Sequence, residues 1–234
     1  MHGLVVEREN KLVAVIIPAL NEEASLPGVL SALPEGLEVL VVDNGSTDDT
    51  AGVARRAGAR LIREARRGYG SAVRAGMRAL EANPPEVVVI VDADHADRPE
   101  LLGHLVNPIL SDRADFVLSE RTWTAERGAL TPQQRLGNQL AITLIARSTG
   151  FQYQDMAPFR AIRWSSLQAL DMRDPTWGWN VEMQMKAVQH GLRIIEVPLP
   201  YRPRAHGRSK ISGSIRGTLR AGTRILQAVY TYHR

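Results

Sequence analysis

The stretch VVIVDADHAD, residues 88–97, runs an apolar segment directly into three aspartates and a histidine. A short, strongly apolar run of this kind is typical of a buried β-strand. Side chains two residues apart point to the same side of an extended chain, so Asp92 and Asp94 can present their carboxylates together at the strand end. Such a pair suits Mg²⁺ or Mn²⁺, which complete their coordination with water and substrate phosphates. The alternative is that the aspartates begin a solvated loop and cap the helix near Pro99.

Around this stretch, apolar runs alternate with helical patterns, which predicts an α/β protein with a Rossmann-like, mostly parallel central sheet flanked by helices. The sequence has no internal repeat and no low-complexity linker, so we expect a single domain. The expected strands are residues 11–20, 37–46, 59–64, 86–94, 114–120, 156–163 and 192–199. The expected helices are residues 24–33, 47–58, 70–83, 98–110, 133–149 and 178–190.

Composition excludes several classes of protein. The 234 residues include no cysteine, so disulfides, thiolate metal sites and cysteine nucleophiles are ruled out. We expect a cytoplasmic protein, because the N-terminus has no signal pattern and every apolar run is shorter than the roughly 20 residues that a membrane span needs. The net charge of +4 is unevenly spread: eight basic and no acidic residues follow Glu196, so the preceding body is net acidic.

Polar groups follow the first four expected strands. They are Asn21 and Glu22 after the first, Asp43 to Ser46 after the second, Arg66 to Gly70 after the third, and Asp92 to Asp94 after the fourth. In open parallel sheets, ligands bind at the carboxyl ends of the strands. Four adjacent strand ends would therefore form one polar cleft.

The chain resembles the inverting family 2 glycosyltransferases of GT-A fold, especially their dolichol- or polyprenol-phosphate sugar synthase branch. The resemblance covers most of residues 13–215, and its seven motifs occur in the order that the family has. These motifs are PALNEE (18–23), VVDNGSTDDT (41–50), RRGYGSAVRAGM (66–77), VVIVDADHADRPELL (88–102), FRAIR (159–163), WNVEMQ (179–184) and EVPLPYRPRAHGRSKISG (196–213). Together they are far more specific than any one of them alone.

The resemblance implies a set of residues that bind the nucleotide. The nucleoside pocket would be lined by Pro18, Leu20, Glu22, Val41 and Asp43, with Asp43 bonding the base. Two positions depart from the family's usual pattern, which has an aromatic residue in place of Leu20 and a second aspartate in place of Asn44. Both departures leave the identity of the base open.

The resemblance also implies residues around the diphosphate. The metal and nucleotide motif is Asp92, Ala93 and Asp94, and the positive groups are Arg67, Arg121, Arg204 and Lys210. Fixed cations and a divalent ion stabilise the charge that grows on a nucleoside diphosphate as it leaves the sugar. We therefore assign catalytic roles to Asp94, Arg204 and Lys210. The alternatives are that Arg121 is a surface arginine at a strand end and that HGRSK (206–210) is a solvated basic loop.

The acceptor determines whether the reaction needs a base. A hydroxyl acceptor must lose a proton, and Glu182 lies where many relatives of the family place their general base. A lipid phosphate is already ionised, and Glu182 would then orient other groups or pair with Lys186 one helical turn away. Trp177 and Trp179 are candidates for an acceptor pocket, although burial in the core is the commoner fate of tryptophan.

The C-terminal segment forms a separate expectation. We expect the glycosyltransferase domain to span residues 1–211 and a basic amphipathic helix to span residues 212–234, with arginines every four residues from Arg216 to Arg224. Such a helix can contact an anionic membrane surface peripherally or pack on the domain with solvated arginines.

Other functions fit the sequence less well. GYG at 68–70 lacks the third glycine of a dinucleotide fingerprint, and a nucleic-acid partner is disfavoured because exposed aromatics do not interleave with the basic residues. The sequence thus predicts a metal-dependent enzyme that uses a UDP- or GDP-sugar, most simply with a polyprenyl phosphate acceptor at the cytoplasmic membrane face. The alternatives are transfer to a soluble or polysaccharide hydroxyl and a catalytically silent nucleotide-sugar or membrane-surface binding protein.

Overall fold

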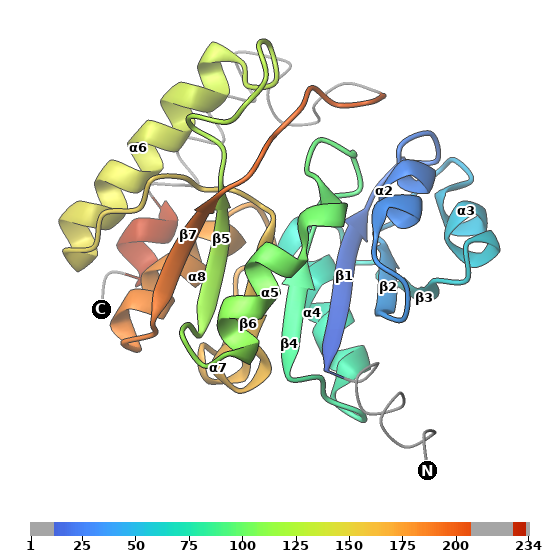
Figure 1. Ribbon diagram of the computed structural model, residues 1–234, viewed down its shortest axis with the longest axis horizontal. Coiled ribbons are helices and arrows are strands. Elements are labelled where there is room, and N and C mark those ends of the chain that lie inside the picture. Colours follow the sequence, from blue (N-terminus) through green and yellow to red (C-terminus); the bar gives the residue numbers. More distant parts are fainter. Residues whose placement is uncertain (1–11, 207–226, 233–234) are drawn as a thin grey trace.

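The computed structural model describes residues 12–206 and 227–232, which form a single α/β domain around a seven-stranded sheet (Figure 1). The strands, in chain order, are β1 (Val13–Ala19), β2 (Glu38–Asp43), β3 (Arg60–Arg63), β4 (Val87–Ile90), β5 (Phe116–Glu120), β6 (Arg160–Arg163) and β7 (Ile194–Pro198). The helices are α2 (Leu26–Ala32), α3 (Thr50–Arg56), α4 (Tyr69–Leu80), η1 (Pro99–Leu101), α5 (Gly103–Leu110), α6 (Pro132–Thr149), α7 (Trp164–Ala169) and α8 (Trp179–Gln189).

The order of strands across the sheet is β3-β2-β1-β4-β6-β5-β7. β1 pairs in parallel with β2 and β4, and β2 pairs in parallel with β3. The carboxyl ends of the first four strands therefore lie side by side at one edge of the sheet, as the sequence predicts.

The orientation of β6 departs from the expected parallel pattern. β6 is antiparallel to both of its neighbours, β4 and β5, whereas β5 and β7 pair in parallel. Its first residue, Arg160, stands opposite Ile90 at the end of β4. Because β6 begins where β4 ends, it brings the start of a strand to the edge at which the other strands finish.

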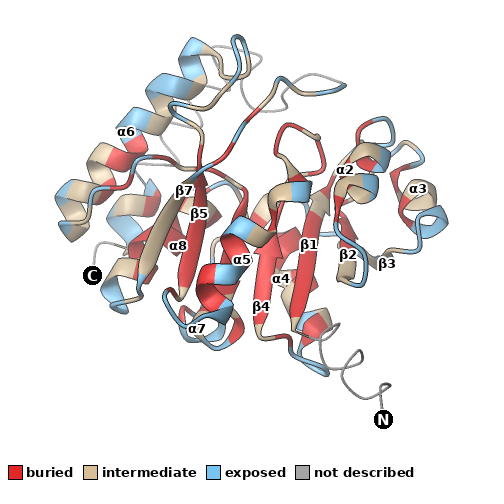
Figure 2. Ribbon diagram, viewed as in Figure 1, coloured by how far each residue is buried: buried red, intermediate tan, exposed pale blue. Residues whose placement is uncertain are grey.

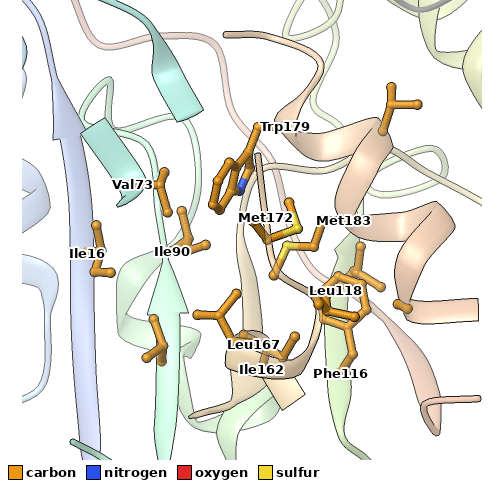
Figure 3. Packing of buried hydrophobic residues seen from close by; sticks show 14 of the residues in the cluster. Ile16, Val73, Ile90, Phe116, Leu118, Ile162, Leu167, Met172, Trp179 and Met183 are labelled. Atoms are coloured by element: carbon orange, nitrogen blue, oxygen red, sulfur yellow. The ribbon is translucent and has the colours of Figure 1, made fainter. Parts of the chain in front are cut away.

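Alternate residues of the strands pack into two cores, one on each face of the sheet. The central strands β1, β4 and β5 are buried along most of their length (Figure 2). Ile16 and Ile90 face a core that α4, α6, α7 and α8 cover, and Ile17 and Val89 face a core that α2, α3 and α5 cover. In the first core, the indole of Trp179 packs beside Val73 and Ile90 (Figure 3). A sheet with helices on both sides typically has strands that are buried on both faces. This explains why the residues of β4, just before the aspartates, are all apolar.

The helices agree with the sequence pattern except in two places. The expected helix at 98–110 is divided into η1 and α5, and α7 follows β6 without having been predicted. By contrast, α6 begins with a capping box between Thr131 and Gln134 and ends at Gly150, whose φ is +77°. Among the described residues, no helix combines the length and the hydropathy needed to cross a membrane.

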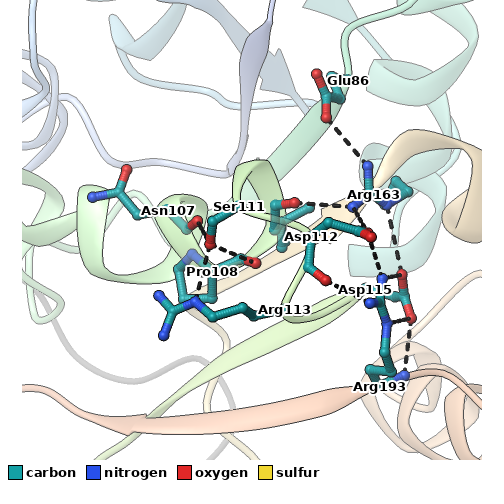
Figure 4. A network of polar contacts seen from close by, with 10 residues as sticks. Glu86, Asn107, Pro108, Ser111, Asp112, Arg113, Asp115, Arg163 and Arg193 are labelled. Carbon is teal, nitrogen blue, oxygen red and sulfur yellow. Dashed lines mark hydrogen bonds and ion pairs between the residues drawn. The ribbon is translucent and has the colours of Figure 1, made fainter.

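A polar network joins the strands at the edge opposite the carboxyl ends of β1 to β4 (Figure 4). Arg193, before β7, donates through Nε and Nη2 to the two oxygens of Asp115 at 2.9 and 2.8 Å, and its Nη2 also reaches Asp112 at 2.7 Å. Arg163, at the end of β6, pairs with Glu86 and Asp112 at 3.2 Å each. The hydrogen bond from Arg193 is the main reason that the pKa of Asp115 is lowered to about 2.

Replacing Asp115 by asparagine is expected to lower the free energy of unfolding at pH 7 by about 1 kcal/mol, because the bidentate pairing with Arg193 is lost while the site stays partly solvated. A lowered folded-state pKa stabilises the protein above the unfolded value near 4, and this stabilisation disappears as the pH falls toward about 2. Urea unfolding at pH 7 and at pH 3 measures the difference, which should shrink at the lower pH. E35Q, at an exposed position before β2, serves as the control.

Candidate active site

The loops that follow β1 and β2 are tied to each other. The backbone N–H of Asn21 donates to Ser46 Oγ at 2.9 Å, and Asn21 Oδ1 accepts from the N–H of Thr47 at 2.7 Å. The N–H of Glu22 donates to Thr50 Oγ1 at 2.8 Å. Asn21 has a φ of +52°, a conformation that asparagine tolerates better than most residues. These bonds fix the two loops in which the nucleoside-binding residues are expected.

The expected nucleoside residues occupy two kinds of position. Pro18, Leu20 and Glu22 are partly buried at the end of β1, next to Asp43 at the end of β2. Val41 is fully buried and packs in the core, so its side chain does not line the surface at the strand ends. The sequence position of Val41 near Asp43 is therefore misleading, because it lies two residues back along a strand that is buried on both faces.

A cavity of about 530 Å³ opens beside Asp43. Its walls come from the β2–α3 loop, from Arg55 on α3, and from Arg63 and Glu64 at the end of β3. Asp43 Oδ1 accepts from the N–H of Ser46 at 2.9 Å, which fixes the carboxylate at the rim. The hollow next to the expected base-binding carboxylate therefore lies on the β3 side, away from Pro18 and Leu20.

The glycines of GYG (68–70) let another part of the chain approach their backbone closely. A Cβ on Gly68 would stand 2.1 Å from the carbonyl oxygen of Pro175, and one on Gly70 would stand 2.0 Å from that of Asp174. The N–H of Ser71 donates to the Pro175 oxygen at 2.9 Å. The glycines thus admit the 174–176 segment of the protein itself. Arg67, just before them, is exposed and donates to the carbonyl of Gly45 at 3.1 Å.

Three aspartates gather at the end of β4. Asp94 and Asp97 are buried, and Asp92 is partly buried. Ala93, which lies between Asp92 and Asp94, packs in the core. Burial, and next the charge of Asp94, raise the pKa of Asp92 above its usual range. Burial, followed by the charges of Asp92 and Asp94, does the same to the pKa of Asp97. The cluster therefore concentrates negative charge in a poorly solvated place, and it needs cations nearby.

Arg204 supplies one of these cations. Its Nη2 lies 2.9 Å from Asp94 Oδ2, and its Nη1 lies 3.5 Å from Glu22 Oε1, while Asp94 Oδ1 accepts from the N–H of Ala96 at 3.0 Å. The segment that carries Arg204 is held against residues 94–96, because Arg202 donates through its backbone N–H to Ala96 and through Nε to His95, at 3.0 and 2.8 Å. Glu22, Asp94 and Arg204, which the sequence separates widely, are thus brought together. Lys210, the second expected cation of this segment, lies outside the described residues.

Arg121 is held by a partner that the sequence did not reveal. Its Nε and Nη2 donate to the two oxygens of buried Asp155 at 2.7 and 2.9 Å, and its guanidinium lies over the ring of Tyr201 at 4.9 Å. The charge of Asp155 raises the pKa of Arg121 against the opposing effect of burial. Arg121 is therefore a fixed cation of the site edge rather than a surface arginine. Asp155 stands in an irregular segment with no recognisable motif, so no sequence signal identifies it.

Arg160 is a further cation, and sequence analysis gave it no role although it lies in the FRAIR motif. It is fully buried at the start of β6, and its Nε donates to the carbonyl of Pro158 at 3.3 Å. Burial lowers the pKa of Arg160, and the charge of Asp92 opposes that effect. The hydroxyl of Tyr69 is also buried, and burial and then the charge of Asp92 raise its pKa. The antiparallel course of β6 places this guanidinium behind the aspartate cluster.

Glu182 does not join the cluster. It is fully buried in the first turn of α8, where its oxygens accept from the N–H groups of Arg173 and Asp174 at 2.8 and 2.7 Å, and Lys186 Nζ lies 2.7 Å away. The pairing with Lys186 agrees with the i, i+4 alternative, but the pair holds the loop before α8 instead of lying exposed. Trp179 is likewise core, whereas Trp177 is half-exposed.

The donor set at the end of β4 fits a hard divalent cation. Asp92 and Asp94 offer carboxylate oxygens, and the described residues hold no group of three or more His, Asp or Glu arranged to bind a metal on their own. Mg²⁺ and Mn²⁺ are commonly held by one or two carboxylates, with substrate phosphates completing the shell. The pair therefore suits a cation that binds together with a diphosphate.

Comparison with known proteins agrees with this arrangement. The pattern of glycosyl transferase family 2 matches residues 14–167. The chain belongs to this family. An uncharacterized glycosyltransferase of Mycobacterium tuberculosis strain H37Rv is 39% identical over 88% of the chain and 93% of its own length. The undecaprenyl-phosphate mannosyltransferase of Micrococcus luteus is 34% identical over 88% of the chain and 89% of its own length.

Solved structures extend the likeness to the fold. Glucosyl-3-phosphoglycerate synthase of M. tuberculosis, in complex with Mn²⁺, UDP and glucosyl-3-phosphoglycerate, superposes with a TM-score of 0.73 at 25% identity, covering 98% of this chain and 86% of that one. This glycosyltransferase therefore has the GT-A fold that the sequence predicts.

The contacts of Glu182 predict a structural effect of its substitution. E182Q is expected to lower the free energy of unfolding by about 1–3 kcal/mol, because one of the two N–H groups of residues 173 and 174 would face an amide NH₂ instead of an oxygen. Urea unfolding measures the change, and E81Q at an exposed helix end provides the matched substitution. Equal stability of E182Q and E81Q would contradict the assigned role.

Proposed function

We propose that this glycosyltransferase moves a sugar, with inversion at the anomeric carbon, from a UDP- or GDP-sugar to a polyprenyl phosphate at the cytoplasmic face of the membrane. The observation that carries the proposal is the meeting of Glu22, Asp94 and Arg204 at the carboxyl ends of the strands. In this arrangement a carboxylate that can bind a metal ion, that of Asp94, lies within hydrogen-bond distance of Arg204, which can bind a phosphate. The protein would touch the membrane peripherally.

In this proposal Asp92 and Asp94 would hold Mg²⁺ or Mn²⁺, and the bound cation would supply positive charge to stabilise the diphosphate. Asp43 bonds the base, and Arg67 approaches the nucleotide from the loop before α4. An oxygen of the acceptor attacks the anomeric carbon while the bond from that carbon to the diphosphate oxygen breaks, and the electron pair leaves with the nucleoside diphosphate. Arg204 and Lys210 stabilise the departing charge, and Arg121 adds a fixed positive field.

The contacts of Glu182 favour an acceptor that needs no general base. Both of its oxygens accept from backbone N–H groups, and Lys186 is also paired with it, so taking a proton from a hydroxyl would require these bonds to break. A phosphate monoester is already ionised at neutral pH. The similar proteins named undecaprenyl-phosphate mannosyltransferase and dolichyl-phosphate hexose transferase, 34% and 32% identical, support the same class of acceptor.

A soluble acceptor is the second candidate. The structural neighbour with 25% identity was solved with glucosyl-3-phosphoglycerate, which is a small, water-soluble product. Transfer to a hydroxyl of this kind would give Glu182 the part of the general base.

Purified protein should transfer labelled sugar from one UDP- or GDP-sugar to undecaprenyl phosphate with Mn²⁺ present, and lose this activity when EDTA removes the metal. D94A is expected to reduce the rate by at least about 10²-fold, because charge on the leaving group would be poorly stabilised. D171A, at an exposed carboxylate outside the site, is the control. Full activity of a D92A/D94A double variant would refute the proposal.

The two acceptors differ in their response to E182Q. With undecaprenyl phosphate, kcat of the folded variant should stay within about ten-fold of the wild type, whereas loss of an essential base would lower kcat by roughly 10²–10⁴-fold. Assays run well below the unfolding temperature of the variant separate this effect from its lower stability. A collapse of kcat with a soluble acceptor only would favour the second candidate.

A further inference from the structure

The side chain of Asn44 is fully used inside the protein. Asn44 directly follows Asp43 at the end of β2 and is buried. Its Nδ2 donates to the carbonyls of Glu64 and Arg66 at 3.0 and 2.9 Å, and its Oδ1 accepts from the N–H of Gly68 at 2.7 Å. One amide therefore binds the β3–α4 connection at three points.

These bonds require an amide. Asparagine has both donors and an acceptor, whereas an ionised carboxylate only accepts. Aspartate at this position would face the two carbonyl oxygens without a hydrogen to give them. The asparagine that replaces the family's usual aspartate is thus explained by the two loop carbonyls that need a donor.

The loop that Asn44 holds carries Arg67. The guanidinium of Arg67 lies against the turn after β2, where it donates to the carbonyl of Gly45 at 3.1 Å. Asp43 is fixed on the same turn by the N–H of Ser46 at 2.9 Å. The backbone adds a further link, because the N–H of Glu64 donates to the carbonyl of Asp43 at 3.0 Å. Asn44 therefore stands between the carboxylate expected to bond the base and the arginine expected to approach the nucleotide.

We infer that Asn44 is a positioning residue of the nucleotide site: its amide sets the place of Arg67 relative to Asp43, and thereby the affinity for the nucleoside diphosphate. The inference rests on the proposed function in that the site binds a nucleoside diphosphate. Asp43 is then the residue of the Asp43–Asn44 pair that can bind the base, because the side chain of Asn44 is already hydrogen-bonded to the loop.

The test measures binding of UDP and of GDP in the presence of Mn²⁺ by calorimetry, with wild type, N44D and N44S. N44D loses both donors to the loop and gains a charge, whereas N44S keeps only one hydroxyl on a shorter side chain and gains no charge. Each is expected to bind the nucleotide preferred by the wild type about ten-fold more weakly or worse. The KM for the sugar nucleotide should rise in parallel, with kcat at saturating donor changed less than about three-fold, a split expected when ground-state and transition-state binding fall together.

A double-variant cycle with R67A tests the coupling. R67A should weaken nucleotide binding in the wild type but add little in N44S, because the arginine is already displaced. N83D, at an exposed asparagine near the opposite end of β4, controls for added charge. Urea unfolding confirms that each variant is folded during the assay.

The outcomes separate the two proposals. If the wild type binds neither nucleotide, the proposed function fails and this inference with it. If the wild type binds one and N44S binds it equally well, or if only N44D is weakened, the positioning role is wrong while the proposed function stands. Additive effects of N44S and R67A would also overturn it.

Discussion

Charge buried at the end of β4 is the constraint on which the rest of the site depends. Asp94 and Asp97 are buried and Asp92 is partly so, and carboxylates in such surroundings are costly unless cations or hydrogen bonds compensate them. Arg204 reaches Asp94 directly, and the charges of Arg121 and Arg160 act on the same cluster. These arginines come from three separate parts of the second half of the chain. The architecture of that half is thus tied to the charge that the first half presents.

Asp94 and Glu182, both predicted to be catalytic, have different surroundings in this fold. Asp94 pairs with a partly exposed arginine at the mouth of the strands, where a ligand can compete for it. Glu182 is enclosed by backbone N–H groups and Lys186, and it supports the loop that packs on the glycines before α4. Asp94 lies at the edge of the sheet and can exchange its partner for a ligand. Glu182 lies beneath the edge and cannot.

Much of the fold follows from the sequence, because the apolar periods of strands and helices are local signals. The mostly parallel sheet and the meeting of the first four strand ends at one edge are confirmed, and so is the family. The reversed β6 was not predictable, since a four-residue strand has the same pattern in either direction. Asp155 escaped notice because a single polar residue in an irregular segment forms no pattern. Arg160 lies in the FRAIR motif at the start of β6, but the motif gave it no role of its own. Val41 shows a different case: it was expected to line the nucleoside pocket, but its side chain is buried in the core. The roles of the individual site residues remain predictions.

The pairing of Arg204 with Glu22 joins positions 182 residues apart, which has a consequence for the order of assembly. During synthesis the amino-terminal residues leave the ribosome first, and contacts so distant in sequence form last. A nascent chain that has not yet reached residue 204 already carries the aspartates of β4, but not the arginine that bridges them to the first loop. The contact between the first loop and Arg204 can therefore form only after residue 204 has emerged.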